Sequence, residues 1–155
     1  MPTFHENSHS PEQRAPADGP QSYPSWTLPQ ELREFEEDGD RTFLAGLIAS
    51  FLADSQDRVQ RLRQAAVCAD FSTLWKQFHA LKGSAGAMGV REVSDLCREA
   101  EGQATSGIDA DYARTVARIE SAFLRVRPAL MAYCAQATRG SHQGTSASEA
   151  SGSRG

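Results

Sequence analysis

His79 is followed by a lysine three residues later and by glycines four and seven residues later. At the helical spacing of about 100° per residue, Trp75, Lys82, Gly83 and Gly86 all lie within about 60° of His79. Each glycine inside a helix costs about 1 kcal/mol of stability relative to alanine. Glycines also let another molecule approach the imidazole closely, and the lysine can neutralise an anion attached to the ring. The pattern therefore favours a histidine that accepts and donates a phosphoryl group.

The opposite face of this predicted helix is apolar and should pack in the core, so His79 should point toward solvent. Its members are Leu74, Phe78, Leu81, Ala85 and Met88, with Phe71 at the margin. An imidazole has an unperturbed pKa of about 6.5, so its neutral nitrogen can act as a nucleophile near pH 7. Trp75 is predicted to lie either at the edge of the core or on a surface that docks a partner.

The elements that position this face are predicted to be helices, because apolar residues recur at three- and four-residue steps. A Thr27-x-x-Gln30 cap starts a short helix to Glu37, and Asp40 caps a second helix. Asp70 or Ser72 starts a third helix, which reaches about Met88 and stops at Gly89. A fourth helix runs to a turn at Ser106-Gly107, and Asp109 caps a fifth. Pro128 should kink the fifth helix or end its first segment. No stretch alternates with a period of two. The expected fold is all-α, an antiparallel four-helix bundle with a short additional N-terminal helix.

Composition predicts one domain between two tails in this 155-residue chain. Residues 1–25 are rich in proline and residues 138–155 are rich in serine and glycine, so both segments are predicted to be disordered, and residues 26–137 should carry the core. The net charge of −4 argues against a strongly basic nucleic-acid binder. No apolar run approaches the roughly 20 residues of a membrane span. Three scattered cysteines without a CxxC motif favour a reducing cytoplasm over a disulfide framework.

The string His79-Ala-Leu-Lys82-Gly83-Ser84-Ala85, followed by Met88-Gly89, resembles the signature of histidine-containing phosphotransfer (HPt) domains. The family pattern is roughly H-x-L-K-G-[SA]-[SA] with a glycine ten residues after the histidine. The resemblance extends over about residues 27–136, where the predicted helices match the four-helix bundle of the family. Gly86 departs from the larger, often polar residue expected at that position.

The resemblance implies that His79 is phosphorylated on a ring nitrogen and exchanges the group with an aspartate of a response-regulator receiver domain. Lys82 then corresponds to the cation beside the phosphate, and Gly83 to the glycine that leaves room for the partner. Trp75 and Gly86 are assigned to partner docking, and Ser84 to a supporting role that helix packing explains equally well. The chain would be a phosphoryl carrier rather than an enzyme, and a monomer that works with receiver domains and a hybrid sensor histidine kinase.

No cofactor is expected in this chain, because Mg²⁺ and the acidic pocket would belong to the receiver domain. His5 and His9 have a spacing that could suit a metal only in a helix, and they lie in the proline-rich tail, so no metal site is predicted. The main alternative is an adaptor that binds a receiver or kinase domain through the His79 face without phosphotransfer. A helical enzyme with a metal or cofactor would need further inward-facing His or Glu ligands, and none is apparent.

Overall fold

The computed structural model describes residues 26–106 and 111–141, and these residues form helices without any strand. The helices are α1 (Gln30–Glu37), α2 (Arg41–Val67), α3 (Phe71–Ala87), α4 (Arg91–Thr105) and α5 (Tyr112–Ser141). The predicted all-α fold is confirmed. The segments 1–25, 107–110 and 142–155 lie outside the described residues, and with them most of both predicted tails.

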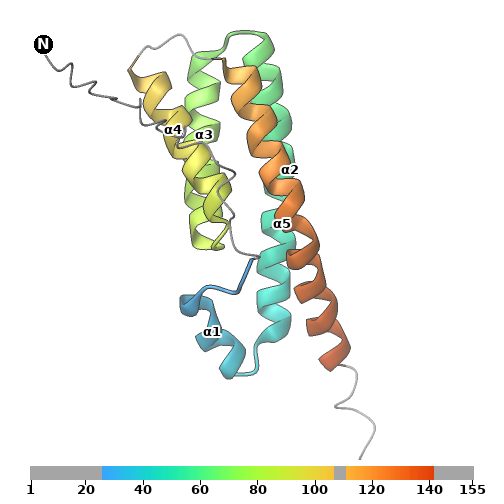
Figure 1. The fold of residues 1–155 in the computed structure, drawn as a ribbon. Helices are drawn as coiled ribbons and strands as arrows, with labels where there is room; N and C mark the ends of the chain where they lie inside the picture. Colours follow the sequence, from blue (N-terminus) through green and yellow to red (C-terminus); the bar gives the residue numbers. More distant parts are fainter. Residues whose placement is uncertain (1–25, 107–110, 142–155) are drawn as a thin grey trace, which may run out of the picture.

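The four longer helices pack side by side, and successive helices run in opposite directions (Figure 1). α2 contacts α3 and α5, and α4 contacts the same two helices from the other side. At a rise of about 1.5 Å per residue, α2 and α5 are each about 40–45 Å long, whereas α3 and α4 are each about 25 Å long. The α3–α4 hairpin therefore covers only part of the α2–α5 pair, and α1 packs against α2 beyond the end of the hairpin.

Residues 26–29 hold the turn between α3 and α4. The indole Nε1 of Trp26 donates a hydrogen bond of 2.7 Å to the carbonyl oxygen of Met88, and its ring lies edge-on to Tyr133 on α5. Gly89 has a φ of +69°, and a Cβ at this position would lie 2.9 Å from Cγ of Pro29. Gly89 thus ends α3 as predicted, because this backbone conformation and close approach both require glycine.

The apolar face of α3 lies in the core as predicted. Leu74, Phe78, Leu81 and Ala85 are fully buried, and they pack with buried side chains from the other long helices. Fully burying one such side chain contributes about 1.5–3 kcal/mol, so this stripe fixes the rotation of α3 about its axis. The residues on the opposite face of α3 are consequently held outward.

Several predicted helix ends differ from the observed ones. The N-cap of α1 is Pro29 rather than Thr27. Asp40 is the N-cap residue of α2 as predicted, but its carboxylate accepts no hydrogen bond from the helix. Asp70 does cap α3, because its carboxylate accepts hydrogen bonds from the hydroxyl and backbone N–H of Thr73, which lower the pKa of Asp70. The predicted cap Asp109 lies outside the described residues.

The last helix continues through Pro128. α5 does not end at Pro128 but continues to Ser141, four residues past the predicted domain boundary at 137. At its start, the carboxylate of Asp111 accepts a hydrogen bond of 3.0 Å from the backbone N–H of Arg114. In the described part of the chain, no helix combines the length and the apolar character needed to cross a membrane.

Candidate functional site

The site is built around His79 in the middle of α3. The His79 side chain is 57% exposed, so the predicted outward orientation is confirmed. Its Nδ1 lies 2.6 Å from Oε1 of Glu101, which α4 presents from the other arm of the hairpin. The buried face of α3 fixes where the ring emerges, and the contact between α3 and α4 brings the carboxylate to it.

Glu101 joins His79 to Lys82. One carboxylate oxygen contacts Nδ1 of His79, and the other accepts a hydrogen bond from Nζ of Lys82. The Glu101 side chain is only 14% exposed. The hydrogen bonds from Lys82 and His79 lower the pKa of Glu101, so the group is a carboxylate at neutral pH. Sequence reasoning missed this residue, although it brings together the two side chains that were predicted to act on phosphate.

The hydrogen bond to Glu101 decides which nitrogen of His79 is free. A carboxylate only accepts hydrogen bonds, so Nδ1 must carry the proton that it donates. In the neutral ring the lone pair is then on Nε2, the nitrogen that does not contact Glu101. The arrangement therefore presents one nucleophilic nitrogen at the surface, with the ammonium group of Lys82 held on the same carboxylate.

The other predicted site residues are Trp75, Gly83, Gly86 and Ser84, and they differ in what they contact. Trp75 stacks on the His79 ring, with the ring centroids 5.2 Å apart and the planes inclined by 17°. Gly83 is exposed, and a Cβ placed there would have nothing within 4 Å. Gly86 is also exposed, but a Cβ there would be 3.4 Å from the hydroxyl of Ser94 on α4. The hydroxyl of Ser84 donates to the carbonyl of Leu81, 3.3 Å away, so it supports the helix backbone.

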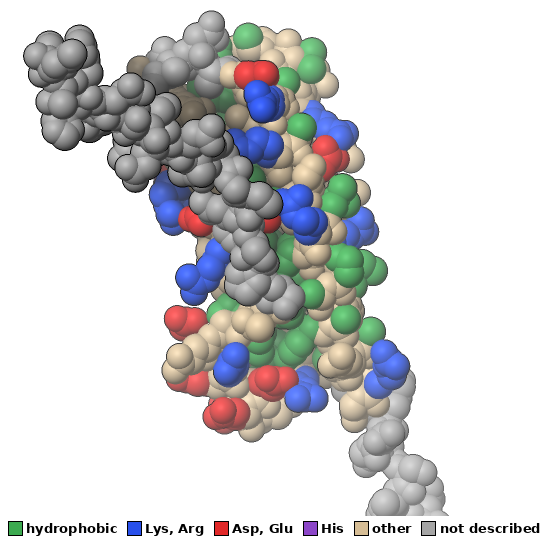
Figure 2. Space-filling view, in the orientation of Figure 1, with side chains coloured by type: hydrophobic (Ala, Val, Ile, Leu, Met, Phe, Trp, Pro, Cys, Tyr) green, Lys and Arg blue, Asp and Glu red, His purple; other side chains and the backbone are tan. Residues whose placement is uncertain are grey.

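Charged groups of both signs lie on the visible surface outside this site (Figure 2). In the view of Figure 2, Asp and Glu side chains gather around α1, Lys and Arg side chains are more frequent over the longer helices, and hydrophobic side chains are exposed along α5. The described residues contain no group of three or more His, Cys, Asp or Glu side chains that could hold a metal ion.

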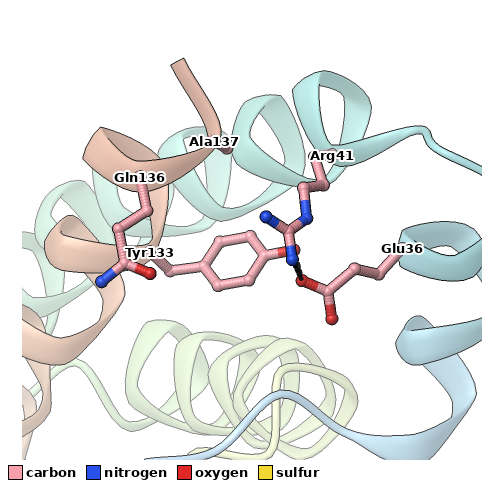
Figure 3. Close-up of a pocket in the computed structure, with 5 residues that line it drawn as sticks. All are labelled: Glu36, Arg41, Tyr133, Gln136 and Ala137. Carbon is pink, nitrogen blue, oxygen red and sulfur yellow. Dashed lines mark hydrogen bonds and ion pairs between the residues drawn. The ribbon is translucent and has the colours of Figure 1, made fainter. Parts of the chain in front are cut away.

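A small pocket lies at the far end of the molecule, between α1, the start of α2 and the end of α5 (Figure 3). Its charged groups neutralise each other, because Arg41 forms an ion pair of 2.9 Å with Glu36. The hydroxyl of Tyr133 contacts the same carboxylate at 3.4 Å, and burial raises the pKa of Tyr133. These contacts connect α1 to α5 and leave the pocket without a free charge for a ligand.

We expect the Glu101→Ala substitution to slow phosphorylation of His79 by a protein donor about tenfold, because it removes the acceptor that holds the proton on Nδ1. The rate should be measured with saturating donor, and the Nδ1–H signal of His79 followed by ¹⁵N NMR. Glu99→Ala is the matched control, since Glu99 is an exposed carboxylate on the same helix and forms no ion pair within the described residues. Equal rates for the two variants would contradict this role of Glu101.

Comparison with known proteins identifies the family. A family model described as the Hpt domain matches residues 46–129, which is more than half of the chain and includes His79, Lys82 and Glu101. Neither the curated proteins nor the solved structures that were compared gave a match. The chain belongs to the Hpt domain family, and as an Hpt domain it has a phosphotransfer role in two-component signalling.

Proposed function

We propose that this chain is a phosphorelay intermediate, in which His79 accepts a phosphoryl group from one receiver-domain aspartate and passes it to another. The observation that carries the proposal is the hydrogen bond between Nδ1 of His79 and Glu101, which leaves Nε2 as the free nitrogen of an exposed ring. The four long helices, α2 to α5, pack against one another and support the helix that carries this ring (Figure 1).

The chemical step needs only groups that this chain and a receiver domain provide. The lone pair on Nε2 of neutral His79 attacks phosphorus, and an N–P bond forms as the P–O bond to the aspartate breaks. The bonding electrons leave with the aspartate oxygen, which becomes a carboxylate. The proton on Nδ1 stays in place, so the phosphorylated ring is an imidazolium whose positive charge faces Glu101. In the reverse direction an aspartate oxygen attacks phosphorus and the electrons return to Nε2.

Lys82 contributes charge neutralisation in this proposal. Its ammonium group is held one helical turn from His79 by Glu101 and can turn toward a phosphoryl group on Nε2. We assign the Mg²⁺ of the reaction to the receiver domain, so this chain would act as a carrier without a cofactor of its own. The proposed partners are receiver domains and a hybrid sensor histidine kinase, which this chain would meet in the cytoplasm as a monomer.

The test is a transfer experiment with purified proteins. Receiver domains from the source organism are phosphorylated with a labelled small-molecule donor, freed of that donor and mixed with this chain. Label should move to the chain in a form that is labile in acid and stable in base, as expected of a phosphohistidine. Adding a second, unphosphorylated receiver should then remove the label. Absence of transfer with every receiver of the organism would refute the proposal.

A further inference from the structure

Trp75 lies directly against the reactive ring, although it is outside the signature string that surrounds His79. The indole and imidazole rings are stacked, with centroids 5.2 Å apart and an interplanar angle of 17°. The two residues are four positions apart on α3, the spacing at which side chains on one helix face meet. Trp75 is 40% exposed, so it lies at the surface and not in the core.

A neighbouring aromatic residue on the same helix, Phe71, does not stack on His79. Phe71 precedes Trp75 by four residues and is 54% exposed, but its ring packs on Tyr112 of α5 at a centroid distance of 5.9 Å. Both aromatic residues therefore present apolar area to the solvent. Only Trp75 also restrains the histidine.

The stacking supplies a restraint that the hydrogen bond alone does not. The bond to Glu101 fixes the position of Nδ1, but the ring plane can still tilt about that bond. An indole face lying nearly parallel to the ring opposes this tilt, because aromatic pairs have preferred geometries. The lone pair on Nε2 lies in the ring plane, so the orientation of the plane sets the direction of attack.

We infer that Trp75 is a positioning residue for phosphoryl transfer, which holds the plane of the His79 ring while Glu101 holds its Nδ1. The inference rests on the proposed exchange with receiver domains. Orientation matters most when both reactants are held by proteins, because a misplacement of about 1 Å can then cost about a hundredfold in rate. A small donor that diffuses freely can approach Nε2 from any direction, and it does not need the ring to be held.

The test compares Trp75→Ala, Trp75→Leu and Trp75→Phe in transfer from a phosphorylated receiver, with Phe71→Ala as the matched control. The maximal rate and the half-saturating receiver concentration are measured separately. Ala and Leu at position 75 should each lower the maximal rate about fivefold, the scale of one aromatic pair, and Phe should restore it. Labelling of the same variants by phosphoramidate should stay within about twofold of the wild-type rate.

Other results would overturn the inference. An increase in the half-saturating concentration at an unchanged maximal rate would make Trp75 a docking contact. Phe71→Ala, the control, should change neither value. An equal loss with phosphoramidate would show that Trp75 changes the reactivity of the ring instead of its orientation. Failure of the wild-type chain to accept label from any receiver would refute the proposed function itself, whereas normal transfer by Trp75→Ala would refute only the role of Trp75.

Discussion

Replacing His79 with glutamine is expected to lower phosphotransfer more than about a thousandfold, because the substitution removes the only nucleophile in the proposed step. Glutamine can still donate a hydrogen bond to Glu101, and the His79 side chain is largely exposed. The free energy of unfolding should therefore stay within about 0.5 kcal/mol of the wild-type value. The measurements are label transfer from a phosphorylated receiver and urea denaturation of both proteins.

The His79→Gln variant also separates a carrier from an adaptor. A carrier should lose transfer while the variant still binds the receiver, since the surrounding surface is unchanged. A wild-type protein that binds the receiver as tightly as His79→Gln and never carries label would instead be an adaptor. Label on the variant would show that a different residue accepts the phosphoryl group.

The second large effect is expected for Gly83→Leu, which should reduce the second-order rate constant of transfer about a hundredfold while making the protein more stable. Gly83 is exposed on α3, and a Cβ there meets no atom within 4 Å, so a side chain at this position begins in open space. Leucine also favours a helix by about 1 kcal/mol relative to glycine. The same side chain would project beside His79, where the receiver must approach.

Gly46→Leu is the matched control, because Gly46 is an exposed helical glycine on α2 that also has nothing within 4 Å of a Cβ. Both variants should show a higher midpoint of thermal unfolding, and only Gly83→Leu should lose transfer. Phosphoramidate should still label Gly83→Leu, since a small donor can pass the leucine. Normal transfer by this variant would refute the idea that the glycine leaves room for a partner.

The histidine face was predictable from sequence because one helix contains it. Leu74, Phe78 and Leu81 follow the helical period and are fully buried, so the exposure of His79 follows from spacing alone. Asp70 was predictable for the same reason, because its capping bonds to Thr73 are local. In both cases the physical cause lies within a few residues of the chain.

Glu101 and the contact of Gly86 could not be read from one helix, since both depend on how α4 packs against α3. Glu101 is 22 residues from His79 in the sequence, and its side chain has a low exposed fraction because α3 and α4 pack together. A usable signal did exist: in an antiparallel hairpin that turns at Gly89, residues about equally far from the turn lie opposite each other. His79 precedes the turn by ten residues and Glu101 follows it by twelve.

Helix ends were the other source of error, because turn geometry is decided by contacts that are distant in sequence. Thr27 has the right spacing for a capping box, but residues 26–29 are occupied by their contacts with the α3–α4 turn, and α1 begins only after Pro29. At Pro128 the prediction was a kink or the end of the first segment of the helix. α5 does not end there, because its packing along α2 offsets the lost backbone hydrogen bond.

The shared carboxylate has a consequence for the energetics of a reversible carrier. Lys82 is already neutralised by Glu101 before any phosphate arrives. A phosphoryl group on His79 would compete for a cation that has a partner, so it gains only the difference between two ion pairs. This gain is smaller than the gain from pairing with a cation that has no other partner. Lys82 would therefore hold the group less tightly than an unpaired lysine would, which makes it easier for the group to leave for an acceptor.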